Sequence, residues 1–144
     1  MESVRYNDGK IRLMVNDDPE RVIAFDPSDV IFLDKLYGLM GDIEKKKIEF
    51  AEAEKELNKE TAVDGYGIPV NMRQKLKLLL DICVYFREQI DLIFGEGTSQ
   101  TVFGDSYKLD MFEQFFAGIT PYIQKSREEK IAKYTGSVQK NVIL

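Results

Sequence analysis

The chain has 144 residues, 44% of them hydrophobic and 31% charged, which is typical of one globular domain that buries its own core. Its net charge of −5 disfavours a nucleic-acid partner, and its single cysteine, Cys83, cannot form an internal disulfide, which fits a reducing cytoplasm. No apolar run approaches the ~20 residues of a membrane-spanning helix, and the first residues lack a signal-peptide core, so we expect a cytoplasmic protein with no membrane association.

Residues 3–25 are expected to form a small antiparallel sheet, as a hairpin or three-stranded meander. A hairpin over 3–15 would turn at Asp8-Gly9, because glycine tolerates the positive φ of a tight turn. A second turn over 16–20 would lead to a third strand over 21–25. Alternating apolar residues give this sheet one face that helices must cover, namely Ile11, Leu13 and Val15.

A first helix is expected over about 27–60. Asp26 would cap its free amides, and Pro27 suits the first helical position. Gly38 and Gly41 interrupt the helix, which indicates close packing or a bend at these positions.

The second half of this helix, from about residue 45, alternates lysine and glutamate and is expected to be a solvated arm. Its few apolar residues include Phe50 and Leu57, which could seat a second copy of the chain. A homo-oligomer is therefore one possible state of the protein.

A second helix is expected over about 70–95. It would begin near Asn71, with Gln74 in the register of a capping box, and end at Gly95. Its apolar residues form stripes on two faces, which indicates a helix that is central in the fold or covered by a partner.

A link over 98–104 would lead to a third helix over about 106–134, kinked by Pro121, and then to a flexible tail over 135–144. The predicted class is mainly α with a small N-terminal antiparallel β-sheet (α+β), with three main helices in a single domain over 1–134.

No residue pattern indicates catalysis, a metal site or a cofactor. The chain has no histidine, which removes the commonest general base and zinc ligand. Asp105 and Asp110 frame a helix start, where capping explains both. The glycine-containing run over 95–104 follows a helix and lacks the lysine of a phosphate-binding loop. We therefore expect a protein that is not an enzyme.

Aromatic residues gather around the third predicted helix. Core packing accounts for most of them, but a helix with so broad an apolar arc can leave one edge exposed as a protein-binding groove. The candidate partner-binding residues are Phe94, Phe103, Met111, Phe112, Phe115, Phe116 and Tyr122.

Four segments in the C-terminal third resemble small proteins encoded in the tail modules of long-tailed phages and prophages of Gram-positive bacteria, which are tail-assembly-chaperone-like. These segments are DLIFGEGT at 91–98, VFGD at 102–105, LDMFEQFF at 109–116 and GITPYI at 118–123. The rest of the chain resembles this group only in its layout of a short sheet, a long helix and a helix pair.

The resemblance implies a non-enzymatic role in the host cytoplasm. Proteins of this kind are thought to bind the tape-measure protein during tail assembly, to keep its apolar helices soluble and to recruit tail-tube subunits. A structural tail component, retained in the virion as an oligomeric ring, is the alternative.

Overall fold

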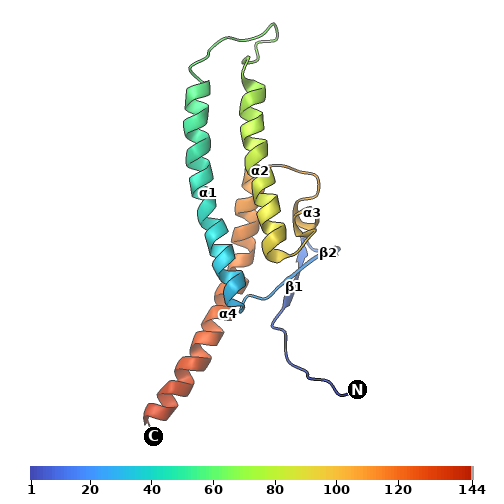
Figure 1. Cartoon of the computed structure of the whole chain (residues 1–144), viewed down its shortest axis with the longest axis vertical. Coiled ribbons are helices and arrows are strands. Elements are labelled where there is room, and N and C mark those ends of the chain that lie inside the picture. Colours follow the sequence, from blue (N-terminus) through green and yellow to red (C-terminus); the bar gives the residue numbers. More distant parts are fainter. Residues whose placement is uncertain (144) are drawn as a thin grey trace.

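The computed structural model describes the backbone of residues 1–143 and the side chains of residues 1–130. The described backbone contains two strands and four helices (Figure 1). The predicted class, mainly α with a small N-terminal antiparallel sheet, is confirmed, but the helices number four rather than three because the predicted link contains a short helix. The elements are β1 (Ile11–Val15), β2 (Asp18–Phe25), α1 (Val30–Leu57), α2 (Met72–Phe94), α3 (Thr98–Phe103) and α4 (Leu109–Ile143).

The sheet is a single antiparallel hairpin of β1 and β2, and its turn lies at Asn16-Asp17. Both residues are left-handed, with φ of 51° and 60°, as a two-residue hairpin turn of the favoured hand requires. The prediction of a turn at Asp8-Gly9 is wrong: Gly9 has a φ of 72°, but Asp8 does not share the left-handed conformation. Residues 1–10 contain no strand, so the sheet has two strands instead of three.

Helix α1 begins later than predicted because Asp29, and not Asp26, caps it. The Asp29 carboxylate accepts hydrogen bonds from the amides of Ile31 at 2.9 Å and Phe32 at 3.2 Å. The Asp26 carboxylate instead accepts from the amide and hydroxyl of Ser28, at 2.9 and 2.6 Å, and closes the turn that precedes the helix. The predicted close packing at Gly38 and Gly41 is also wrong, since a Cβ added at either would meet nothing within 4 Å.

Helix α2 starts directly after Asn71, as predicted, but the side chain of Asn71 does not cap it. The Asn71 amide group donates instead to the carbonyl of Leu57, the last residue of α1. The predicted capping box with Gln74 is therefore absent, and Asn71 ties the end of one helix to the start of the next.

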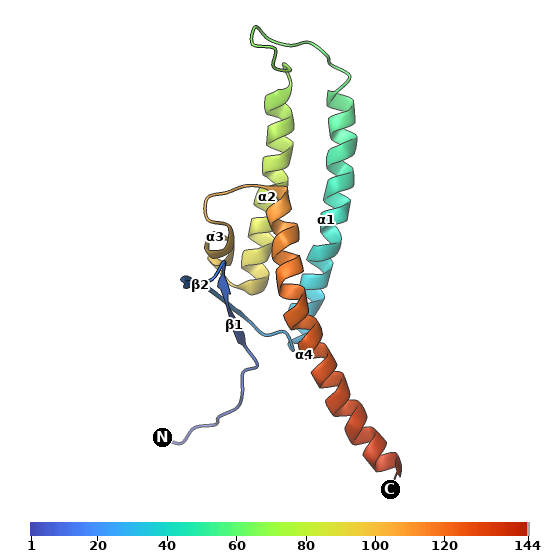
Figure 2. The ribbon, with the colours of Figure 1, turned by 180° about the vertical axis from the view of Figure 1, so that it is seen from behind.

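Helix α4 contains Pro121, which leaves the carbonyl of Ala117 without a backbone amide partner. This missing hydrogen bond is the reason for expecting a kink at Pro121. The kink itself stays a prediction. The helix continues to Ile143, beyond the predicted end near residue 134, and its C-terminal part leaves the bundle (Figure 2). The mobility predicted for 135–144 stays a prediction. No described helix is long and apolar enough to cross a membrane.

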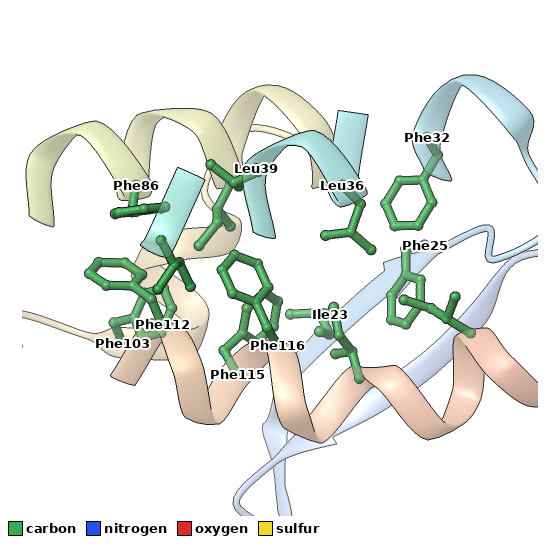
Figure 3. Close-up of a cluster of buried hydrophobic side chains, with 14 of the residues drawn as sticks. Ile23, Phe25, Phe32, Leu36, Leu39, Phe86, Phe103, Phe112, Phe115 and Phe116 are labelled. Carbon is green, nitrogen blue, oxygen red and sulfur yellow. The ribbon is translucent and has the colours of Figure 1, made fainter. Parts of the chain in front are cut away.

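The core lies where α1, α2, α4 and the hairpin meet, and we call this part of the molecule the base (Figure 3). Every phenylalanine except Phe50 belongs to one continuous aromatic cluster in the base. Phe115 joins its two halves, with ring centroids 5.3 Å from Phe94 and 5.7 Å from Phe103. Such edge-to-face pairs add to the stabilisation that burial provides.

Residues 44–82, which we call the helical arm, project beyond the base (Figures 1 and 2). Helix α4 begins beside the middle of α2 and contacts the arm where it joins the base, through the ion pair of Glu113 with Lys47. Beyond this contact the arm consists of α1, α2 and their connecting loop. The last buried apolar residue of α1 is Ile43, and the first of α2 is Cys83. The arm therefore has no buried apolar side chain of its own.

Candidate functional site

The single thiol has no chemical role in this structure. Cys83 is buried in the core, and burial raises the pKa of its thiol, so the reactive thiolate is disfavoured. Among the residues whose side chains are described, no three acidic or cysteine side chains gather in an arrangement that could hold a metal ion.

Arg87 organises the link between α2 and α4. Its buried guanidinium donates to the carbonyls of Gly104 at 2.8 Å and Ser106 at 3.1 Å, and to the side-chain oxygen of Gln100 at 2.9 Å. The ring of Tyr107 lies over it, 4.7 Å away. Three oxygens and an aromatic face thus compensate the cost of burying a cation.

The short helix α3 is fixed at both of its ends. At its start, the carboxylate of Asp91 accepts from the amide and hydroxyl of Ser99, at 2.7 and 2.9 Å. At its end, Arg21 of β2 donates to the carbonyls of Thr101 and Val102, at 2.9 and 2.7 Å. These contacts give a structural role to residues of the segments at 91–98 and 102–105, on which the resemblance partly depends. The sequence signal that could have indicated these contacts is the presence of two charged residues, Arg87 and Asp91, inside an apolar helical pattern.

The seven candidate partner-binding residues differ in their exposure. Phe103, Phe112, Phe115 and Phe116 are buried, and Phe94 and Met111 are partly buried against the core. Tyr122 is exposed, at 46%. The structure brings these residues together, but mainly as the core of the base, and an exposed groove over Phe112 and Phe116 is not present.

A cleft of about 530 Å³ runs between β1 and α4, and we call it the β1–α4 cleft. Four of the candidate residues line it: Phe103, Met111, Phe115 and Tyr122. The opposite wall is formed by consecutive residues from Arg12 to Asp17. The sequence predicted a turn over 16–20, where this hairpin turns, but it did not indicate that the hairpin and α4 would leave a cleft between them.

A row of exposed apolar side chains runs along α2, from the helical arm into the adjoining turn of the base. Leu76, Leu80 and Val84 are 55%, 47% and 38% exposed and follow one another at intervals of four residues, so they lie on one face of the helix. A hollow of about 410 Å³ lies beside them, between α1 and α2, lined in part by Leu57 and Leu78.

The loop at the tip of the arm is ordered by its own hydrogen bonds. The Asp64 carboxylate accepts from the amides of Tyr66 at 2.8 Å and Ile68 at 3.1 Å, and Val63 forms a β-bridge with Pro69. Large apolar side chains of this loop are nevertheless exposed, namely Val63, Tyr66, Ile68 and Val70. The arm thus presents apolar surface along α2 and at its tip, which is typical of a protein-binding surface.

The two apolar faces of α2 were the sequence signal for the exposed row, since they indicated a helix that is central or covered by a partner. No signal in the sequence distinguished the tip loop from an ordinary solvated loop.

The chain belongs to DUF6673, a family of unknown function whose family model matches residues 20–141. The match includes the helical arm and most of α4. The chain matches no curated protein and no solved structure.

Proposed function

We propose that the protein is a non-enzymatic phage tail-assembly chaperone whose helical arm binds apolar helices of the tape-measure protein in the host cytoplasm. The observation that carries this proposal is the exposed apolar row of α2, formed by Leu76 and Leu80 in the helical arm and Val84 directly after it. An amphipathic helix laid along this row would become the third helix that the arm lacks.

The expected contact is weak for a single arm. Burying the exposed parts of three such side chains yields on the order of 3 kcal/mol before the costs of association are subtracted. Weak contacts suit a chaperone, because the tape-measure protein must be released when the tail tube forms around it. Many copies bound along one long partner would hold it collectively.

The tip of the arm offers a separate apolar surface. Tyr66 and Ile68 lie in the connecting loop, beyond the end of the row on α2. We assign to this loop the second contact that the resemblance implies, with the tail-tube subunits.

Co-expression with the tape-measure protein of the same gene cluster, followed by pull-down and size-exclusion chromatography with light scattering, tests the proposal. The wild-type chain should give a soluble complex with several copies per tape-measure protein. The double variant Leu76→Ser, Leu80→Ser should lose most of this binding. Leu92→Ser is the matched control, because Leu92 is also an exposed leucine of α2 but lies in the base.

Equal binding by the double variant and the control would refute the role of the arm. A discrete self-assembled ring that ignores the tape-measure protein would favour the structural tail component instead.

A further inference from the structure

The N-terminal segment, residues 1–10, extends away from the rest of the molecule (Figures 1 and 2). Its exposed large apolar side chains are Met1, Val4 at 92% and Tyr6 at 85%. In an extended chain, residues two apart point to the same side, so Val4 and Tyr6 form one apolar edge. The segment therefore has the pattern of a strand, but no strand beside it.

One edge of the strand β1 is not paired with another strand. The strand pairs with β2 on one side only, so its other edge carries unpaired amides and carbonyls. Consecutive residues 12–15 of β1 line the β1–α4 cleft, whereas a cleft over one face alone would be lined by alternate residues. Ile23 of β2 also lines it, so the cleft extends from the free edge of β1 under the inner face of the hairpin. An extended peptide there would gain backbone hydrogen bonds and contact Met14 and Tyr122.

The N-terminal segment cannot easily reach the cleft of its own chain. It would have to reverse at Asp8-Gly9, but Asp8 lacks the positive φ that both favoured two-residue hairpin turns, types I′ and II′, need at their first position. Gly9 also lies against the carboxylate of Asp26, just beyond the end of β2, because a Cβ on Gly9 would be 2.9 Å from Asp26 Oδ1. The segment thus continues past the hairpin and away from the cleft.

We propose that the N-terminal segment of one copy binds in the β1–α4 cleft of a second copy and adds a strand to its sheet. Because the two surfaces of this contact differ, the segments either exchange reciprocally between two copies, which closes a dimer, or bind head-to-tail from copy to copy until a ring closes. The contact uses the base and leaves the helical arm free. It therefore does not depend on the proposed function.

Cysteine cross-linking distinguishes a contact between copies from a contact within one chain. Tyr6→Cys combined with Gly118→Cys places one thiol on the segment and one in the cleft, where a side chain at Gly118 meets nothing within 4 Å. Tyr6→Cys with Gly38→Cys is the matched control, because Gly38 is equally open but lies on α1 outside the cleft. The native Cys83 is buried and stays unchanged.

On a non-reducing gel after mild oxidation, the first pair should give dimers for the reciprocal exchange or a ladder of higher species for the ring, well above the control. A disulfide within one chain, or no excess over the control, would overturn the proposal. Light scattering gives a second measurement: Val4→Asp with Tyr6→Asp should reduce the mass of the wild-type oligomer to that of a monomer with unchanged circular dichroism. An unchanged mass would also overturn it.

Discussion

The base and the helical arm are built from the same two helices, yet they differ in what covers those helices. In the base, α4 and the hairpin cover α1 and α2 and bury residues such as Leu36 and Phe86 completely. In the arm, α1 and α2 pack against each other, α4 contacts them only at Lys47 through Glu113, and Leu76 and Leu80 remain about half exposed. The comparison shows that an apolar helical stripe alone does not decide between core and binding surface.

The polar contacts of the two regions differ in the same way. The base holds Arg87 in a buried network, and Tyr85 donates to the carboxylate of Asp42 at 2.7 Å between α2 and α1. The ion pairs within the helices of the arm, such as Lys77 with Asp81, are exposed and contribute little to stability. The arm therefore depends on the base for its order.

Truncating a leucine in each region should give the largest contrast. Leu36→Ala in the base should lower the free energy of unfolding by about 2–5 kcal/mol, because it leaves a cavity. Leu80→Ala in the arm should cost less than about 1 kcal/mol, because its side chain is 47% exposed. Urea unfolding followed by circular dichroism measures both values. Equal costs would show that the arm is packed as tightly as the base.

Removing the buried cation should give the next largest effect. Arg87→Met keeps much of the side-chain volume but leaves the acceptors of Gly104, Ser106 and Gln100 without their donor. Each such loss costs about 1–3 kcal/mol, although water can compensate part of it. Hydrogen exchange should accelerate over residues 98–106 and remain unchanged in the arm. Unchanged exchange in α3 would contradict the role assigned to Arg87.

Replacing Gly38 or Gly41 by alanine should have a smaller effect on stability, and the effect should be stabilising. Gly38→Ala and Gly41→Ala should each stabilise the protein by about 0.5–1 kcal/mol, because alanine is the better helix former. A thermal unfolding midpoint that rises in both variants would confirm that no neighbour packs against these positions. A fall would mean that the glycines serve a close contact.

The smallest effect concerns alkaline pH. The hydrogen bond to Asp42 is the main cause that raises the pKa of Tyr85, with burial second. This contribution to stability is present below the tyrosine pKa of the unfolded chain and is lost as the pH rises through the higher pKa of the folded state. The wild type should therefore lose more stability than Tyr85→Phe between pH 8 and pH 11. Parallel losses in urea midpoints would contradict this assignment.

Local signals predicted the fold where local chemistry decides it. Gly95 ends α2 as expected, because a glycine at a helix end acts within one turn. Asn71 precedes the helix as expected, but its side chain binds the carbonyl of Leu57 and does not cap the helix. The sheet was predicted in part: the turn over 16–20 is present, whereas the turn at Asp8-Gly9 and the strand before it are absent. A good turn sequence such as Asp8-Gly9 does not decide whether the chain before it pairs with β1.

The candidate site could be predicted only in part for a related reason. The aromatic residues of α4 correctly indicated dense packing. No pattern within α4 tells how much of this helix the hairpin and α1 cover. The exposure of Leu80 likewise depends on where α4 begins relative to α2, which the sequence of α2 does not contain.

Hydrogen exchange with and without the co-expressed tape-measure protein tests the central claim most directly. In the free protein, amides of the helical arm should exchange faster than those of α2 and α4 in the base. In the complex, protection should rise over residues 44–82 and change little in the base. Protection that rises only in the base, or an arm that is already as protected as the base in the free protein, would contradict the account.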